Sequence, residues 1–258
     1  MKIGKPAASS LGVLAAVIAV SGASSQTSVA GNAVATNAAC TLPQGSRRVA
    51  LAPADFTTRI DNPYWPMTPG SRWIYRETDP EGSRHKVVVT VTSKTKQISN
   101  GITARIVHDA VTDEGSPVEL TDDFYAQDKC GNIWYLGEST KEYENGKITS
   151  TSGSFEAGVD GAQAGVIVPA RPVAGLSYRQ EYYVGQAEDR AQVVSLADQV
   201  EVPFGHFGRT KVLMTREWNP LHPRDLEFKF YARGIGPALA IGVSGGSDRE
   251  ELVSFTRG

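Results

Sequence analysis

The sequence predicts an all-β protein: an antiparallel curved sheet or barrel of about twelve strands, with few or no helices in the mature chain. Three observations predict it. After residue 55, apolar and polar residues alternate in short runs, which is the period of a strand with one buried face. Gly, Asn, Asp and Pro separate these runs, as they do in turns. No window keeps the i, i+3, i+4, i+7 spacing of an amphipathic helix.

The first landmark after residue 55 is the segment 62–70 (NPYWPMTPG). Its three prolines hold it extended, and we expect its Tyr and Trp to plug one end of the core. The expected strands then follow in order, at residues 72–78, 84–95, 102–112, 118–127, 133–136, 178–184, 187–196, 199–203, 210–218, 226–232, 239–243 and 252–255.

Two further stretches are expected to connect strands. Asn145-Gly146 supplies the two positive φ angles of a type I′ hairpin turn. Residues 153–165 hold four glycines and show no alternation. They predict a long loop, and long loops inside compact domains are often functional.

The N-terminus predicts export. In residues 1–23, two lysines precede a ten-residue apolar run, Leu11–Val20, and small residues follow, as in a secretory signal peptide. That run is shorter than the about 20 residues of a membrane-spanning helix, and no later segment is apolar enough to span a bilayer. Residues 24–55 are expected to form a flexible arm and residues 56–258 a single antiparallel β domain. The mature protein is expected to be soluble and secreted or periplasmic.

The charge of the chain argues against polyanionic partners. Removal of the signal peptide takes away Lys2 and Lys5, which leaves 24 basic and 28 acidic side chains and a net charge of −4. Arg47-Arg48 is the only basic pair, and no dense basic run exists. Nucleic acid and anionic membrane surfaces are therefore not expected as partners.

The chain has two cysteines, Cys40 and Cys130. In an exported protein the first expectation is one disulfide, which would close a loop of about 90 residues. A lipid-modified Cys40 is an alternative, because Ala38-Ala39-Cys40 is similar to a lipobox, although it lies far beyond the apolar run. Two free thiols are the third possibility.

No sequence motif indicates a cofactor site, a metal site or a catalytic nucleophile. The four histidines, His85, His108, His206 and His222, are never two to four residues apart, so no metal site is expected from local spacing. The sequence contains no phosphate-binding loop, no dinucleotide fingerprint and no Gly-x-Ser-x-Gly elbow. We therefore expect no cofactor and no hydrolase of the α/β type.

Carboxylates are the strongest chemical signal. A pair of them could cleave glycosides, with an acid and a base or nucleophile about 5–9 Å apart. Oxygen-rich loops could instead hold calcium, but Asp160-Gly161 lacks the acidic spacing of a calcium loop. The candidate catalytic residues are Glu138, Glu156, Asp160, Glu181 and Glu188.

Aromatic and charged residues predict a binding hollow instead. Alternation places Arg179, Glu181 and Tyr183 on one face, as in a pocket with a polar anchor. Aromatic side chains would line the hollow, namely Trp73, Trp134, Tyr135, Tyr183 and Phe228. The candidate ligand-binding residues are Trp134, Tyr135, Glu138, Arg179, Glu181 and Tyr183.

Five stretches of the sequence are distinctive as a set: NPYWPMTPGSRWIY, FYAQDKCGNIWYLGEST, GSFEAGVDGA, YRQEYYVGQAED and VEVPFGHF. With them the chain resembles a group of uncharacterised exported bacterial β-rich proteins over about residues 55–255. The string VPFGHF, Val202–Phe207, is also similar to a turn in periplasmic half-barrel domains of the lipoprotein-carrier type. That resemblance implies a curved antiparallel sheet around an apolar hollow.

Two functions stay open on the sequence alone. The first is binding of a small ligand or polymer segment in the hollow of a barrel-like protein. The second is an extracellular carboxylate-dependent hydrolase or lyase that acts on a polysaccharide or a similar polymer. The identity of the ligand and the oligomeric state do not follow from the residues.

Overall fold

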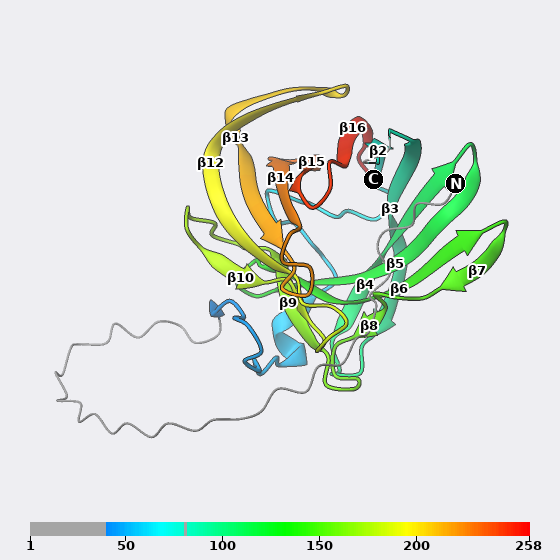
Figure 1. The fold of residues 1–258 in the computed structure, drawn as a ribbon. Helices are drawn as coiled ribbons and strands as arrows, with labels where there is room; N and C mark the ends of the chain where they lie inside the picture. Colours follow the sequence, from blue (N-terminus) through cyan, green and yellow to red (C-terminus); the bar gives the residue numbers. More distant parts are fainter. Residues whose placement is uncertain (1–39, 80–81) are drawn as a thin grey trace, which may run out of the picture. The chain divides into compact units, whose positions relative to one another are not determined.

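The computed structural model describes residues 40–79 and 82–258. Its compact unit, Leu42–Gly258, holds sixteen antiparallel strands and one short 3-10 turn, Pro53–Asp55. No α-helix occurs in these two ranges, and no helix in them is long and apolar enough to cross a membrane. The prediction of an all-β antiparallel protein is confirmed (Figure 1).

Most strands lie where alternation predicts them, and many are longer than expected. The strands are β1 (Phe56–Thr57), β2 (Arg72–Thr78), β3 (Arg84–Gln97), β4 (Thr103–Asp113), β5 (Ser116–Asp128), β6 (Ile133–Glu144), β7 (Lys147–Ser150), β8 (Phe155–Glu156), β9 (Gln163–Val168), β10 (Ser177–Arg179), β11 (Glu181–Tyr182), β12 (Arg190–Val202), β13 (Gly205–Trp218), β14 (Leu226–Ala232), β15 (Gly236–Ser244) and β16 (Arg249–Thr256).

Thirteen strands form one path through the sheet, in the order β10-β12-β13-β14-β15-β16-β2-β3-β4-β5-β6-β9-β11. The two ends of the path are neighbours in sequence, since only Gln180 separates β10 from β11. β10 pairs with β12 and β11 pairs with β9, so this one segment joins both ends of the sheet. If β10 and β11 are counted as one strand, the nearly closed barrel has twelve strands around its circumference.

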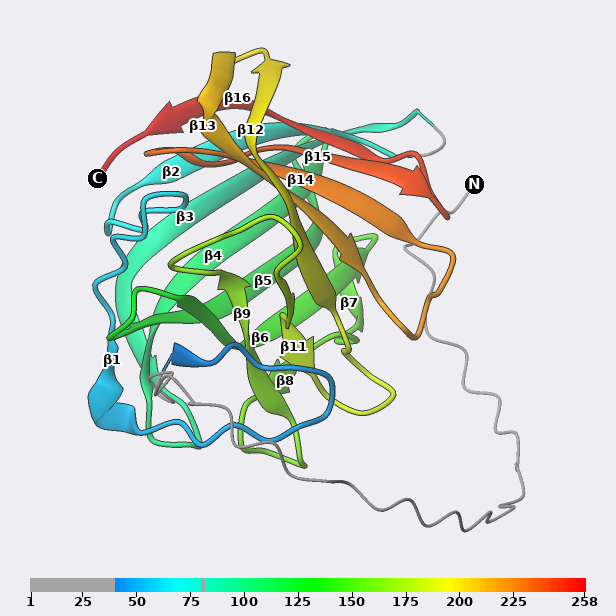
Figure 2. The same cartoon turned by 90° about the vertical axis from the view of Figure 1, so that its left-hand side faces the viewer.

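Gly165 of β9 permits this closure. A side chain at this position would collide with the backbone of Gln180. The two segments can therefore approach closely only because residue 165 has no Cβ atom. Figure 2 shows the long strands β2–β6 and β12–β16 facing each other, with β9 and β11 between them.

The segment 62–70 closes the interior, as predicted. Tyr64 and Met67 are buried. The ring of Trp65 lies 5.6 Å from that of Tyr125 on β5 and 6.2 Å from that of Tyr231 on β14. These two strands are six steps apart in the sheet, so Trp65 connects opposite walls of the barrel.

Both cysteines, Cys40 and Cys130, are disulfide-bonded, which confirms the first expectation. Cys130 lies in the turn between β5 and β6. The carboxylate of Asp128 accepts hydrogen bonds from the backbone N–H groups of Cys130 and Asn132, both at 2.9 Å, and so holds this turn.

The chain from Leu42 onward lies against the sheet. Leu42, Val49 and Leu51 pack on the core. The guanidinium of Arg179 donates to the carbonyl oxygens of Gly45 at 2.7 Å and Arg47 at 3.0 Å. The predicted signal peptide and most of the expected arm fall in residues 1–39, outside the described residues.

Candidate functional site: a carboxyl-lined barrel interior

Side chains on alternate positions of each strand face the interior, and many of them are carboxyls. Cross-strand partners share a face, which places Asp123 opposite Glu138 and Glu217 opposite Glu227. The interior carboxyls come from strands all around the ring and, for Asp189, from the loop before β12: Asp109, Asp123, Glu138, Glu181, Asp189, Glu217, Glu227 and Glu250.

The first cluster forms around Tyr135. Its hydroxyl lies 2.7 Å from Asp123 Oδ1 and 2.7 Å from Glu138 Oε2. A phenol has a single proton to donate. If both contacts are hydrogen bonds, the second proton must come from a carboxyl, so one of the two acids is protonated. Asp123 lies directly opposite Glu138, and a register shift before the pair Tyr125 and Tyr135 turns Tyr135 to the same side as Glu138.

The electrostatic surroundings support a protonated acid at this cluster. Burial raises the pKa of Asp123 well above its usual value, and the charges of Glu138 and Asp109 raise it further. The hydrogen bond from Tyr135 opposes this increase. Burial and the charges of Asp123 and Glu138 also raise the pKa of the Tyr135 phenol, so the phenol keeps its proton.

Glu181 and Asp189 form a second carboxyl pair. Their side chains hydrogen-bond each other, which requires one proton between them. Burial, followed by the charges of Asp189 and Glu138, raises the pKa of Glu181 well above its usual value. Burial also raises the pKa of Asp189. Because the charges of Glu138 and Asp123 act on Glu181, the two carboxyl pairs belong to one site.

A cation compensates part of the negative charge on the facing wall. Lys229 Nζ lies 2.9 Å from Glu217 Oε2 and 3.1 Å from Glu227 Oε1. Thr215 also donates to Glu217 at 2.8 Å. Burial alone would lower the pKa of Lys229, but these two carboxylates raise it well above its usual value.

Glu250 on β16 extends the carboxyl surface further. Burial raises its pKa to about 8, with contributions from the charges of Asp109 and Glu77. The same wall contributes Tyr75, whose pKa is raised by burial and by Glu250.

The interior is not completely filled by side chains. The side chains of Lys229 and Glu227 remain 32% and 30% exposed, although strands surround both of them. Asp123, Glu138, Glu181 and Asp189 are likewise only partly buried. These partly exposed groups border the space inside the ring of strands, which we call the hollow.

Three of the residues predicted from the sequence meet in this hollow: Tyr135, Glu138 and Glu181. Trp134 lies elsewhere. Its indole donates to Asp128 at 2.8 Å, and its ring packs against Phe56 with the centroids 6.0 Å apart. Trp134 is therefore a structural residue at the end of the barrel.

The remaining candidate carboxylates have local partners. Glu156 pairs with Lys96 at 2.8 Å and accepts the N–H of Ser99 at 2.7 Å. Asp160 is exposed in the turn before β9, with φ of 48°. Glu188 accepts the N–H of Gly185 at 3.0 Å, within its own loop.

Arg179 and Glu181 do not share one strand face as alternation predicts, because the break at Gln180 separates β10 from β11. Arg179 is buried and bonds to backbone carbonyls of Gly45, Arg47 and Ala164. Burial lowers its pKa to about 10. Tyr183 lies in the following turn, bridged to Ala187.

Two of the aromatic residues expected in the hollow do not line it. Phe228 alternates with Glu227 and Lys229, so its side chain faces outward. Trp73 is completely buried, and its indole donates to Ile235 O at 2.9 Å.

Sequence reasoning missed the interior carboxyls of the β12–β14 wall and the lysine among them. One signal was present. In residues 226–232 (LEFKFYA), Glu227, Lys229 and Tyr231 alternate with Leu226, Phe228 and Phe230. Such a strand has one polar and one apolar face, but alternation alone does not show which face is inside.

The carboxyls of the hollow are not arranged as metal ligands. Among residues 40–79 and 82–258, no group of three or more His, Cys, Asp or Glu side chains is placed to hold a metal ion. The groups that the site offers to a ligand are protonated and ionised carboxyls, phenols and one ammonium group.

No protein-family model and no curated protein matches this sequence. Two solved structures match it. A candidate lipoprotein from Parabacteroides distasonis ATCC 8503 is 12% identical, with 75% of this chain and 98% of that chain covered and a TM-score of 0.41. A beta-barrel-like protein of the domain of unknown function DUF1849 from Brucella abortus is 13% identical, with 72% and 96% covered and a TM-score of 0.35.

We therefore describe the class of this protein from its own strand arrangement and not from these matches. It is an antiparallel, nearly closed β-barrel-like protein with a carboxyl-lined interior, closed by Trp65.

Proposed function

We propose that this is an exported binding protein that takes up a small cationic ligand in the barrel interior. The observation that carries the proposal is the partial exposure of carboxyls that strands surround on all sides. An amine in this hollow would meet the one negative charge that each proton-sharing pair keeps, Asp123 with Glu138 and Glu181 with Asp189, next to the phenol of Tyr135. Carboxylates and aromatic faces are the groups that bind ammonium ions.

The disulfide supports the exported location. Stable structural disulfides form in oxidising compartments such as the periplasm or the extracellular space. Both cysteines of this chain are bonded. An extracytoplasmic location also agrees with the predicted signal peptide, and cleavage can be checked by N-terminal sequencing of the secreted protein.

Titration calorimetry with putrescine, spermidine and choline tests the ligand class. We expect at least one of these amines to bind, with an affinity that falls as salt concentration rises. Glu181→Gln should weaken binding by at least tenfold. Asp160→Asn is the matched control, because it removes one carboxylate from an exposed turn and Asn tolerates a positive φ. Absence of binding by all three amines, or equal losses in both variants, would contradict the proposal.

A carboxylate-dependent hydrolase or lyase is the second candidate. The observation that favours it is the pair of proton-sharing carboxyl clusters, Asp123 with Glu138 and Glu181 with Asp189. A protonated acid beside an ionised carboxylate is what general acid–base cleavage of a glycoside requires. On a polysaccharide and ester panel, Glu138→Gln and Glu181→Gln should each abolish any activity found, whereas Glu156→Gln should retain it.

A further inference from the structure

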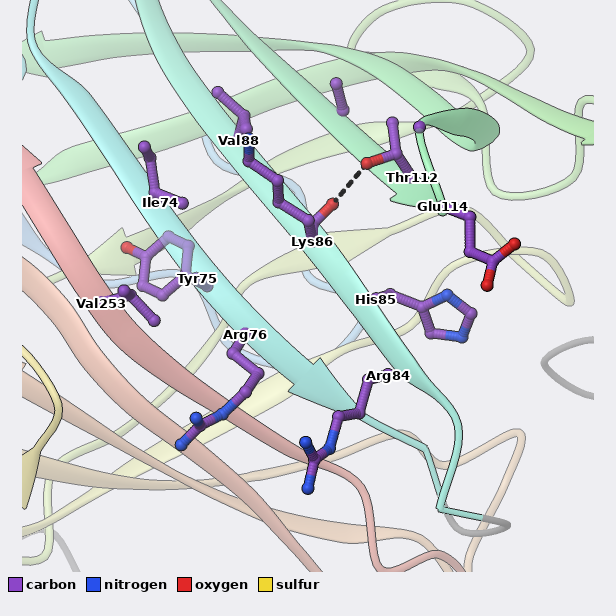
Figure 3. Close-up of a pocket in the computed structure, with 12 residues that line it drawn as sticks. Ile74, Tyr75, Arg76, Arg84, His85, Lys86, Val88, Thr112, Glu114 and Val253 are labelled. Carbon is purple, nitrogen blue, oxygen red and sulfur yellow. Dashed lines mark hydrogen bonds between the residues drawn. The ribbon is translucent and has the colours of Figure 1, made fainter.

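A groove of about 780 Å³ crosses the outer face of the wall formed by β16, β2, β3 and β4 (Figure 3). Strand register places it there. Ile74 lies opposite Val88, and Val88 lies opposite Ala110. These residues alternate with the buried Tyr75 and Val87, so they face away from the barrel interior.

The floor of the groove is apolar. Ile74, Val88 and Ala110 form one row across three strands, and Val253 of β16 continues it. Val253 is 40% exposed. Exposed apolar surface inside a concave site is typical of ligand-binding grooves.

A second apolar element borders this floor. The N–H of Phe204, at the tip of the β12–β13 hairpin, donates to Leu252 O at 3.0 Å. The hairpin tip therefore lies next to Val253. Phe204 is 38% exposed, and its ring stacks on that of Phe207 with the centroids 6.3 Å apart. Together these residues extend the apolar surface beyond the groove.

Basic side chains line the other end of the groove. Arg76 lies opposite Lys86, and Arg84 lies two pairs further along the same two strands, on the same face. Arg76 already pairs with Glu251 at 2.7 Å. Neither Arg84 nor Lys86 has an ion-pair partner in the part of the chain that the structure describes. Two cations are thus available to a ligand.

The groove includes one carboxylate, Glu114. In Figure 3 it lies beside His85, whereas Arg76 and Arg84 point together to another side. The basic end and the apolar floor are therefore not neutralised by Glu114, and the site is amphipathic: positive at one end and apolar along its length.

We propose that this groove binds a small organic anion with an apolar body, such as a fatty or aromatic carboxylate or sulfonate. The volume falls within the range of about 300–1,000 Å³ of small-molecule sites, which favours a small ligand over a macromolecule. Arg84 and Lys86 would hold the anionic group, and Val88 and Val253 the apolar part. The proposal does not depend on the function of the interior, which lies on the opposite face of the same wall.

The probe is 8-anilinonaphthalene-1-sulfonate, followed by its fluorescence on the intact native protein. We expect saturable binding at a single site, displaced by dodecanoate and not by dodecylamine. N-phenyl-1-naphthylamine, which has the same apolar rings without the sulfonate, should bind at least tenfold more weakly. Equal binding of both dyes would overturn the proposal, because the basic residues would then play no part.

Two variants distinguish the contribution of the basic end of the groove to dye binding from that of its apolar floor. Arg84→Gln with Lys86→Gln should weaken dye binding at least tenfold and remove its salt dependence. Val88→Thr keeps the size of the side chain and should weaken binding about three- to tenfold without changing salt dependence. The matched control is Lys147→Gln with Arg171→Gln, which neutralises two exposed cations outside the groove.

Near-UV circular dichroism shows whether each variant keeps its native packing. If natively packed Arg84→Gln/Lys86→Gln protein binds the dye as tightly as the control variant does, or if the wild-type protein does not bind the dye at all, the proposed site is wrong.

Discussion

The Nζ atom of Lys229 lies 2.9 Å from Oε2 of Glu217, inside a barrel whose interior is otherwise lined by carboxyls. Glu227 makes a second ion pair with the same lysine, at 3.1 Å. Lys229→Met would leave both carboxylates without this cation. We expect it to lower the free energy of unfolding by roughly 3 kcal/mol, as measured by urea denaturation.

A double variant tests the cause of that loss. Lys229→Met combined with Glu217→Gln should recover a substantial part of the stability, because the carboxylate that lost its counter-charge is neutralised. Strictly additive losses would show that Lys229 stabilises the fold by packing alone.

The second prediction concerns the hydroxyl between Asp123 and Glu138. Tyr135→Phe removes the donor at 2.7 Å from each carboxyl and should cost about 1 kcal/mol. Because this hydrogen bond lowers the pKa of Asp123, its removal should raise that pKa further. Carbon-detected NMR titration of the Asp carboxyl carbons measures the change. An unchanged pKa would mean that the Tyr135 hydroxyl does not bond Asp123.

The third prediction is a loss of stability as the pH rises. Glu250 has a pKa of about 8 in the folded protein, above its ordinary value of 4.5, so the folded state holds its proton more tightly than the unfolded state. Its contribution is complete below about pH 4.5 and is lost as pH rises toward 8, with a slope of up to about 1.4 kcal/mol per pH unit. Denaturation at several pH values between 5 and 8 should show the decline. Glu250→Gln should flatten it, and an unchanged slope would assign the decline to other carboxyls.

The fourth prediction tests closure of the barrel. Gly165→Ala should destabilise the protein by about 3 kcal/mol, because the new Cβ atom collides with the Gln180 backbone. Gly208→Ala is the matched control. A Cβ atom added at residue 208 would meet no other atom within 4 Å, so we expect a change within about 1 kcal/mol. Thermal unfolding compares the two, and equal melting temperatures would refute the close contact.

The fifth prediction concerns the disulfide. Cys40→Ser with Cys130→Ser opens a loop of about 90 residues and should cost roughly 4–5 kcal/mol in the chain-entropy model. A reducing agent should produce the same loss in the wild-type protein and none in the variant. A wild-type protein whose stability is insensitive to reduction would indicate that the bond contributes little.

The sequence predicted the fold class and the positions of most strands along the chain. Alternation in residues 84–95 and 226–232 is a local property, and it requires no knowledge of neighbouring strands. The same holds for the Asn145-Gly146 turn, where both residues have positive φ, and for the proline-rich plug around Trp65. Turn chemistry and fixed φ angles decide such features within a few residues. The short strands β1, β7, β8 and β9 were not predicted; β9 (QAGVIV) has apolar residues at consecutive positions and therefore shows no alternation.

The carboxyl pairs of the site could not be predicted from the sequence, because they join residues from distant parts of the chain. Glu138 and Glu181 were candidates, but nothing local pairs them with Asp123 and Asp189. A bulge and the break at Gln180 decide which side chains turn inward. Sequence pattern therefore determined that this chain forms strands with one polar face. Only the closure of the sheet decided that these polar faces point inward and meet, because closure sets which strands face each other across the hollow.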